Sequence, residues 1–199
     1  MSEILCVTNR TLCKGNFLER IEKIAAAKPA GIILREKDLH ETEYMELASK
    51  VMNICRKYNT QCILHSFISV AKELKADAIH IPMPILMQLE KDDIAQFSIV
   101  GASCHSAEEA GIAEKKGCTY IVAGHVFDTE CKKGVSGRGL TFIEKVRERV
   151  SIPVYAIGGI CSENIVDLEK TGVKGVCVMS SIMTTENISE YIKNLHCVT

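Results

Sequence analysis

The sequence predicts a closed barrel of eight parallel strands, each followed by a helix, and three observations support this fold class. Short β-branched runs recur along the whole chain, amphipathic segments separate them, and no linker or low-complexity tract interrupts the series. Strict alternation of strands and helices is typical of a parallel sheet. Eight such units favour a closed (β/α)8 TIM barrel over an open sheet, and we expect one domain over residues 1–199.

The expected strands are near-continuous apolar runs, as in parallel strands that are buried on both faces. They are Ile4–Val7, Gly31–Leu34, Cys62–His65, Ala78–Ile81, Ser98–Gly101, Tyr120–Ala123, Pro153–Ile157 and Gly175–Met179. The clearest helical segments place their apolar residues on one face. They are Phe17–Ala27, Glu41–Tyr58, Ala107–Lys116, Leu140–Arg149 and Cys161–Lys170.

Local signals mark several helix ends. Ser106 followed by Glu109 is a capping-box pattern at the start of one helix. Gly117 and Gly172 fall where a helix C-terminus usually needs a left-handed residue. These signals agree with the helical boundaries that periodicity predicts.

Composition restricts the function classes. The chain has 199 residues, 47% of them hydrophobic, and a net charge of -1. No basic stripe is visible, so we expect no nucleic-acid partner. The apolar runs are far shorter than the roughly 18 residues that span a bilayer, and the first residues do not resemble a signal peptide. We therefore expect a soluble, cytoplasmic protein without membrane contact, and a homodimer, since barrels of this kind often dimerise.

Ten cysteines are many for this length, but none are spaced as C-x-x-C. Cys6, Cys62, Cys118 and Cys177 fall in or beside expected strands, where they are predicted to act as small buried hydrophobic residues. We expect reduced thiols, as in a reducing compartment. Nothing in the pattern indicates a structural metal or a cofactor.

The functional residues of such barrels follow the carboxyl ends of the strands. Gly158 and Gly159 follow the seventh expected strand, and Ser180 and Ser181 follow the eighth. Glycine backbone lets a phosphate approach the amide N–H groups, and a helix start favours an anion. We predict a phosphate site here. The alternative is that the glycine pair only makes a tight turn.

Two cations follow the second expected strand. Arg35 and Lys37 could bind a second anionic group, such as a carboxylate or a diphosphate. The alternative is a solvated run of charges that form ion pairs with Glu36 and Asp38. Spacing alone does not favour either interpretation.

Three histidines fall at strand ends: His65, His105 and His125. Their convergence favours general acid–base chemistry, with His125 as the main candidate because it precedes a long loop. No carboxylates stand beside them, so we do not expect a metal site. His80 lies within a strand and is expected to be packed or hydrogen-bonded, whereas His40 and His196 are expected at the surface.

The segment after His125 is polar and cationic, with Lys132, Lys133 and Arg138 available to close over an anionic ligand. The alternative is a disordered surface loop. Cys131 would be a nucleophile only if the neighbouring lysines lowered its pKa.

Five motifs, in order along essentially the whole chain, resemble the thiamine phosphate synthase superfamily. They are LREKD, GASCHS, GHVFDTECKKG, PVYAIGGI and GVKGVCVMSSI. The longer stretch GHVFDTECKKGVSGRG is similar to the thiazole tautomerase (TenI-like) branch of that superfamily. The resemblance therefore implies a TIM barrel of thiamine biosynthesis.

The synthases of this superfamily join a pyrimidine diphosphate to a thiazole phosphate. They hold Mg²⁺ and diphosphate with an Asn-Asp pair after the third strand and with a second Asp after the fourth. Here His65-Ser66 and Ile81-Pro82-Met83-Pro84 stand at those places. A hard cation needs oxygen ligands, so this departure argues against synthase activity.

Resemblance to the tautomerase branch implies an isomerase that aromatises a carboxylated thiazole phosphate by proton transfer, without metal or cofactor. It implies acid–base catalysis by His125 and phosphate binding by Gly158, Gly159, Ser180 and Ser181. Further substrate contacts are expected from Arg35, Lys37, Cys104, Thr129 and Lys132. The alternatives are a Mg²⁺-dependent thiamine phosphate synthase and a non-catalytic protein that binds a thiamine-related ligand.

Overall fold

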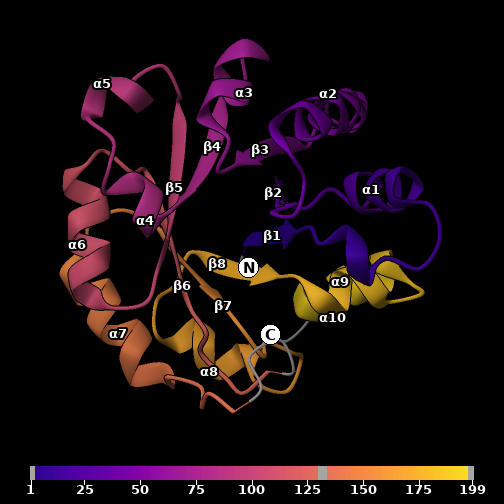
Figure 1. Cartoon of the computed structure of the whole chain (residues 1–199). Helices are drawn as coiled ribbons and strands as arrows, with labels where there is room; N and C mark the ends of the chain where they lie inside the picture. Colours follow the sequence, from indigo (N-terminus) through magenta and orange to yellow (C-terminus); the bar gives the residue numbers. More distant parts are fainter. Residues whose placement is uncertain (1–2, 130–133, 197–199) are drawn as a thin grey trace.

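A computed structural model of the chain describes residues 3–129 and 134–196, and its eight strands close into a barrel in sequence order (Figure 1). All neighbouring strands are parallel, including β1 with β8, where Leu5 faces Cys177. The strands are β1 Glu3–Val7, β2 Gly31–Leu34, β3 Gln61–His65, β4 Ala78–Pro82, β5 Ile99–Cys104, β6 Tyr120–Gly124, β7 Val154–Ile157 and β8 Gly175–Val178. The predicted fold class is therefore confirmed.

Helices surround this ring of strands (Figure 1). The longer ones are α1 Phe17–Ala26, α2 Glu41–Tyr58, α6 Ala107–Lys115, α7 Leu140–Arg149 and α10 Ile188–His196. The short ones are η1 Arg10–Leu12, α3 Ile68–Glu73, α4 Met83–Leu86, α5 Lys91–Ile94, α8 Ile165–Lys170 and α9 Ser180–Thr184. None of the described helices is both long and apolar enough to cross a bilayer.

Two boundaries differ from the predicted ones by more than one residue. Strand β5 continues to Cys104, because Ser103 and Cys104 still pair with β6 beyond the glycine at 101. Helix α8 begins at Ile165, because the Asn164 side chain accepts a hydrogen bond from the Cys161 N–H at 2.9 Å and holds the preceding residues in a turn.

The predicted helix caps are largely present. Ser106 Oγ accepts the N–H of Glu109 at 3.1 Å, but the Glu109 carboxylate accepts the N–H of His105 rather than that of Ser106. Gly117 and Gly172 have φ of 101° and 76°, which only glycine adopts readily, and each follows a helix end.

The apolar core has two layers, because successive strand residues point to opposite sides of the barrel wall. On β6, Tyr120 and Val122 belong to the barrel interior, whereas Ile121 and Ala123 pack in the layer beneath the helices. Near the carboxyl ends of β3, β4 and β5 the interior positions become polar. The eight described cysteines are free thiols, and of the four strand cysteines only Cys62 is not fully buried.

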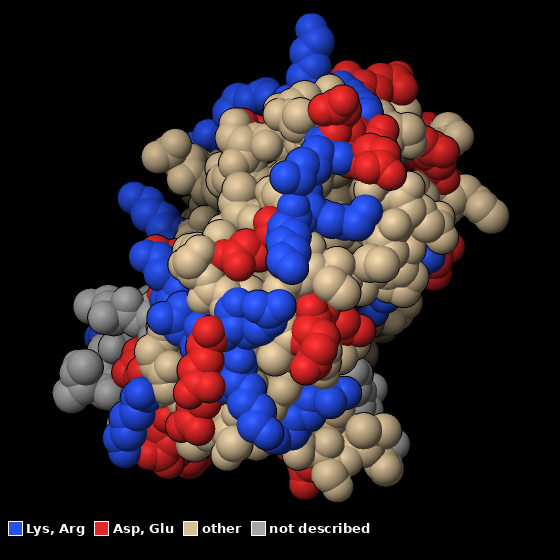
Figure 2. Space-filling model, turned by 90° about the vertical axis from the view of Figure 1, so that its left-hand side faces the viewer, with Lys and Arg blue, Asp and Glu red and all other residues tan. Residues whose placement is uncertain are grey.

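The outer surface over α5, α6 and α7 carries both signs of charge. Figure 2 shows Lys and Arg side chains interspersed with Asp and Glu across this face. This face therefore offers no single-sign surface for a polyanion.

Candidate active site at the carboxyl end of the barrel

In the segment after β2, residues 35–38, the acidic side chains point away from the barrel mouth and the basic side chains point toward it. Glu36 is buried, and its carboxylate accepts hydrogen bonds from Thr8 Oγ1 at 2.5 Å and from the Arg10 N–H at 2.9 Å. Asp38 forms an ion pair with the Arg10 guanidinium at 2.7 Å. Burial raises the pKa of Glu36, and the bonds from Thr8 and Arg10 oppose that rise. Both carboxylates thus serve to fix the loop after β1.

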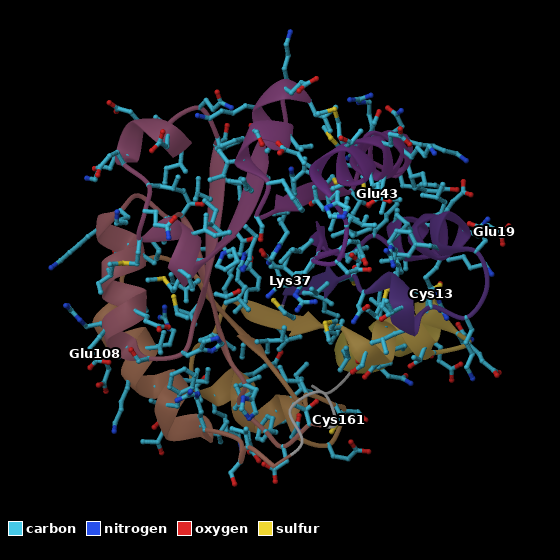
Figure 3. The ribbon with its side chains drawn as sticks, in the orientation of Figure 1. Cys13, Glu19, Lys37, Glu43, Glu108 and Cys161 are labelled. Carbon is cyan, nitrogen blue, oxygen red and sulfur yellow. The ribbon has the colours of Figure 1, made fainter. Side chains whose placement is uncertain are left out.

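Arg35 and Lys37 point the other way, to the mouth of the barrel. The charges of both residues act on the buried His65, and that of Lys37 also acts on His80. Figure 3 shows Lys37 over the centre of the ring of strands, whereas the labelled Glu43 lies out at α2. The backbone N–H of Arg35 is held by Thr8 Oγ1 at 2.9 Å. The structure therefore brings two predicted binding residues to the mouth, on the side opposite the carboxylates.

His80 is the centre of a polar network inside the barrel. Its Nε2 lies 2.7 Å from Ser103 Oγ, and its Nδ1 lies 3.0 Å from the Tyr120 hydroxyl. Burial, with a smaller contribution from the charge of Lys37, lowers the pKa of His80 to about 3, so this imidazole is neutral at pH 7. The expectation that His80 is hydrogen-bonded is confirmed.

One tautomer of His80 gives a continuous chain of donors through this network. Burial holds the pKa of Tyr120 well above its ordinary value, so its hydroxyl keeps its proton and can donate to Nδ1 of His80. In that arrangement Nε2 of His80 carries the ring proton and donates to Ser103 Oγ. The hydroxyl proton of Ser103 is then available to a group in the mouth.

His65 lies beside His80, with ring centroids 5.8 Å apart and ring planes 17° from parallel. Its Nδ1 is 2.7 Å from Ser66 Oγ. Burial lowers the pKa of His65 to about 2, with smaller contributions from His80, Arg35 and Lys37. Ser66 has a φ of 67°, an uncommon value for a residue with a side chain, at the point where β3 meets the mouth.

Sequence reasoning missed Ser103 and Tyr120. The signal that could have found them is the alternation of strand residues: Ala78 and His80 share one side of β4, and Gly101 and Ser103 share one side of β5. Gly101 is required there, because a Cβ at this position would lie 2.0 Å from the Tyr120 ring.

His125, the predicted acid–base residue, is buried and turned toward the loop that follows it. Its Nε2 lies 3.1 Å from the Val135 carbonyl, to which it can only donate. Its Nδ1 is buried and has no hydrogen-bond partner among residues 3–129 and 134–196. His105 bonds the Gly124 carbonyl through Nδ1 at 2.7 Å. The histidines at the mouth near Arg35 and Lys37 are therefore His65 and His80, and His125 is not one of them.

The predicted phosphate residues lie at neighbouring strand ends, because β7 pairs with β8. Gly158 and Gly159 have φ of 105° and 66°, and Ser180 and Ser181 open α9. A Cβ on Gly159 would lie 2.4 Å from the Asp128 carbonyl oxygen. Packing against the segment after β6 therefore also requires glycine here, and phosphate binding stays a prediction.

The expected substrate contact from Cys104 does not fit the structure. Its side chain is fully buried in the layer between barrel and helices, and burial raises the pKa of its thiol. Ser103, on the opposite side of the strand, faces the interior instead. Thr129 ends the described part of the loop, while Cys131, Lys132 and Lys133 lie outside the described residues.

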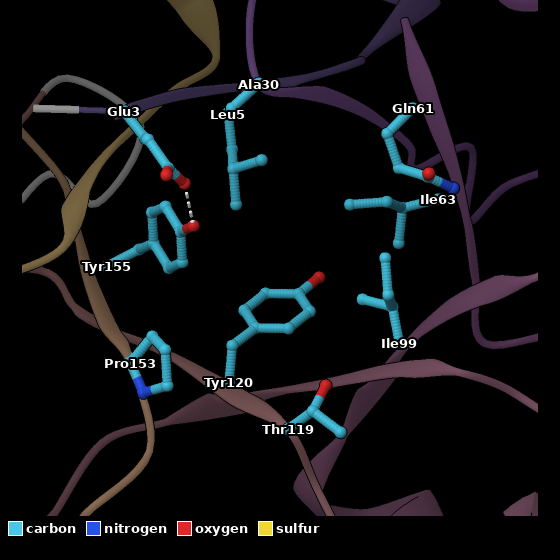
Figure 4. A pocket seen from close by; sticks show the side chains of 10 residues that line it. All are labelled: Glu3, Leu5, Ala30, Gln61, Ile63, Ile99, Thr119, Tyr120, Pro153 and Tyr155. Carbon is cyan, nitrogen blue, oxygen red and sulfur yellow. Dashed lines mark hydrogen bonds between the residues drawn. The ribbon is translucent and has the colours of Figure 1, made fainter.

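A hollow of about 360 Å³ lies at the opposite, amino end of the barrel (Figure 4). It is mainly apolar. Its lining side chains are Glu3, Leu5, Ala30, Gln61, Ile63, Ile99, Thr119, Tyr120, Pro153 and Tyr155. No Lys or Arg is among them, so the cations that could bind an anion gather at the carboxyl end.

The mouth does not fit a magnesium ion bound in the manner of the synthases. Where those enzymes place carboxylates, this chain has the His65 and Ser66 side chains and the segment Pro82–Pro84. Among the described residues, no group of three or more His, Cys, Asp or Glu side chains is placed to hold a metal ion. Imidazole and thioether are poor ligands for this hard cation, so no catalytic step is assigned to a bound magnesium.

The fold and the mouth define a (β/α)8 barrel with an anion-attracting carboxyl end. Residues 4–182 match the model of the thiamine monophosphate synthase family. The chain is 31% identical over 191 residues to the thiamine-phosphate synthase of Alkaliphilus oremlandii, covering 95% of this chain and 91% of that protein. It is 33% identical over 183 residues to a putative thiamine-phosphate synthase 2 of Aquifex aeolicus, covering 92% and 98%.

Solved structures agree. The thiamine phosphate pyrophosphorylase from Pyrococcus furiosus superposes with a TM-score of 0.85 at 31% identity, over 98% of this chain and 94% of that one. A 3-hexulose-6-phosphate synthase superposes with a TM-score of 0.72 at 17% identity, over 100% and 99%, which shows the shared fold alone. The chain belongs to the thiamine monophosphate synthase family.

This family places the chain among the enzymes of thiamine biosynthesis. The expected thiazole tautomerase activity is wrong, because the similar curated proteins and the similar pyrophosphorylase structure are named for the synthase reaction. The misleading signal was the motif after β6, which resembles the tautomerase branch locally, whereas identity over nearly the whole chain follows the synthases.

Proposed function

We propose that the protein is a thiamine-phosphate synthase, a transferase that joins a pyrimidine diphosphate to a thiazole phosphate. The observation that supports this proposal best is the pair Arg35 and Lys37 at the mouth of a barrel of this family, with Glu36 and Asp38 held away by Thr8 and Arg10. Two cations at one mouth suit a substrate with a diphosphate group.

In the proposed reaction, the thiazole ring nitrogen forms a bond to the methylene carbon of the pyrimidine substrate. The bond between that carbon and the diphosphate oxygen breaks, and its electron pair leaves with the diphosphate. Negative charge therefore grows on the departing group, where Arg35 and Lys37 stabilise it. Removing water from the mouth strengthens that stabilisation, because charges interact more strongly at low dielectric.

The remaining polar groups orient the substrates. Ser103 donates its hydroxyl proton to an acceptor on the substrate when Nε2 of His80 donates its ring proton to Ser103 Oγ. The thiazole phosphate takes the predicted site at Gly158, Gly159, Ser180 and Ser181. No proton needs to move in the transfer step, so His125 positions its loop through Val135.

The test is steady-state formation of thiamine phosphate from the two substrates. Lys37→Met removes one of the two cations and is expected to lower kcat/KM by roughly a hundredfold. Lys50→Met, at an exposed position of α2, is the matched control and should leave kcat/KM within about twofold of the wild type. A folded wild-type protein that forms no product, or equal rates for the two variants, would contradict the proposal.

A further inference from the structure

We infer that the mouth binds the diphosphate group through this chain's own donors and cations, without a divalent ion held by protein carboxylates. The inference rests on the proposed function for the identity of the anion. It departs from the metal-dependent site that resemblance to the synthases implies. The argument depends on which way each polar group of the mouth is turned.

Four carboxylates that the structure describes after β2, β5 and β6 are bound to protein donors. Glu36 accepts from Thr8 and from the Arg10 N–H, and Asp38 pairs with Arg10. After β6, Asp128 accepts the Gly137 N–H at 2.7 Å. After β5, Glu109 accepts the His105 N–H at 2.6 Å. A metal ion would have to compete with these bonds for each of the four carboxylates.

The residues after β3 and β4, where the synthases hold a cation, do not supply the oxygen ligands that it needs. Ser66 is engaged with Nδ1 of His65, the Pro82 side chain has no oxygen, and Met83 is buried in the first turn of α4. Oxygen ligands in an octahedral arrangement, which Mg²⁺ demands, are not assembled from these side chains.

The same mouth is rich in groups that suit an oxyanion. Arg35 and Lys37 supply positive charge. If Ser66 donates to Nδ1 of His65, then Nε2 of His65 carries a proton, and no described residue accepts it. If Nε2 of His80 donates to Ser103 Oγ, the Ser103 hydroxyl proton is likewise available to a ligand. Cations and donors gathered at one mouth attract a diphosphate and repel a free divalent ion.

The inference is tested by calorimetric titration of the full-length protein with inorganic diphosphate, once in EDTA and once in excess Mg²⁺. We expect binding in EDTA, with a Kd within about threefold of the value in Mg²⁺. Lys37→Met should weaken binding in EDTA by about tenfold to a hundredfold, because it removes a charged hydrogen-bond partner. Lys50→Met, on the outer surface of α2, should bind as the wild type does.

Ser66→Asp is a variant whose diphosphate binding should depend on Mg²⁺, unlike that of the wild type. Aspartate tolerates the positive φ at this position, so the variant is expected to fold, which circular dichroism checks. A carboxylate beside Arg35 and Lys37 should weaken diphosphate binding in EDTA by about tenfold or more, and Mg²⁺ should restore part of the loss. Unchanged binding by this variant in EDTA would place the diphosphate elsewhere and overturn the inference.

The calorimetric binding measurement does not depend on whether the protein forms thiamine phosphate. Wild-type binding that requires Mg²⁺, or no binding in either buffer, overturns the inference even if thiamine phosphate is formed in the presence of the metal. Binding in EDTA supports it even if no product is formed, in which case only the proposed function fails.

Discussion

The two ends of the barrel are built from the same eight strands but have opposite chemistry. At the amino end, Glu3 receives hydrogen bonds from the Tyr155 hydroxyl at 2.5 Å and from Lys174 at 2.8 Å, beside an apolar hollow. At the carboxyl end, Arg35 and Lys37 lie at the mouth, where Glu36 and Asp38 are bound by Thr8 and Arg10. The amino end thus holds a carboxylate paired within the protein beside an apolar hollow, whereas the carboxyl end gathers cations and polar side chains.

Tyr120 connects the two ends. Its ring lines the hollow at the amino end, whereas its hydroxyl bonds His80 at the level below the mouth. The barrel interior therefore changes from apolar to polar along the length of the Tyr120 side chain. The comparison predicts that substitutions at the carboxyl end change activity, and that substitutions at the amino end change stability.

Charge reversal should separate the ends most clearly. Lys37→Glu is expected to lower kcat/KM for thiamine phosphate formation by about a thousandfold or more, because it places a negative charge where diphosphate charge develops. Lys174→Glu reverses a charge at the other end and should change kcat/KM by less than about threefold. Similar losses for both variants in the same assay would remove the distinction between the two ends.

The buried histidines of the carboxyl end should make the fold sensitive to acid. The pKa values of His65 and His80 are lowered to about 2 and about 3 in the folded protein, against about 6.5 in an unfolded chain. Below pH 6.5 the unfolded chain binds protons that the folded chain does not, so stability falls as pH falls. From pH 7.5 to pH 5.0 each histidine should cost about 2 kcal/mol of unfolding free energy.

Urea denaturation at the two pH values measures this loss. The double variant His65→Asn/His80→Gln is the control, and its unfolding free energy should fall by about 4 kcal/mol less than that of the wild type. Parallel losses in the two proteins would mean that other groups are responsible for the acid sensitivity.

Gly101→Ala should displace Tyr120, the side chain that connects the two ends of the barrel. A Cβ at this position would lie 2.0 Å from the Tyr120 ring, which is held on its other sides by the barrel interior. Overpacking of this kind destabilises proteins by about 1–3 kcal/mol, and the Tyr120 ring must move away from His80. Thermal unfolding checks the effect, with Gly31→Ala as the control, because this strand glycine also lacks a positive φ and its added Cβ would approach no atom closer than 3.2 Å. Equal losses would mean that the contact with Tyr120 is not the cause.

The smallest effect is expected from Glu3→Gln. Burial raises the pKa of Glu3, but the bonds from Lys174 and Tyr155 outweigh it and lower the pKa overall. This contribution to stability is therefore present above the unfolded pKa and lost as pH falls through the folded one. Because Glu3 is 39% exposed, the substitution should cost less than about 1 kcal/mol at pH 7 in urea denaturation, and kcat should not change. A large loss of kcat would show coupling through the barrel.

The strands could be predicted from sequence because each one is a short apolar run between polar segments. Arg35 and Lys37 could be placed at the mouth because the residue after a buried parallel strand must lie at its carboxyl end. Their separation from Glu36 and Asp38 could not be predicted, since it depends on Thr8 and Arg10, far away in the chain. The choice between Ser103 and Cys104 could not be made either, because β5 continues three residues beyond the expected end at Gly101 and its alternation then decides which side chain faces the interior.

His125 shows a different limit. Its position directly after β6 was readable from the sequence, but the direction of its ring was not, because that is fixed by the Val135 carbonyl across the loop. The activity was misjudged for a related reason. One local motif outweighed similarity spread over the whole chain, and the departure from the synthase pattern after β3 and β4 was interpreted as evidence for a different reaction.

The most direct test follows the phosphorus atoms of both substrates by ³¹P NMR in a single reaction with the wild-type protein. We predict that the two coupled signals of the pyrimidine diphosphate ester give way to the single signal of inorganic diphosphate, while the monoester signal persists in a product with the mass of thiamine phosphate. Persistence of both starting signals, or release of diphosphate with only a pyrimidine alcohol as the organic product, would contradict a transferase that acts at the carboxyl end of the barrel.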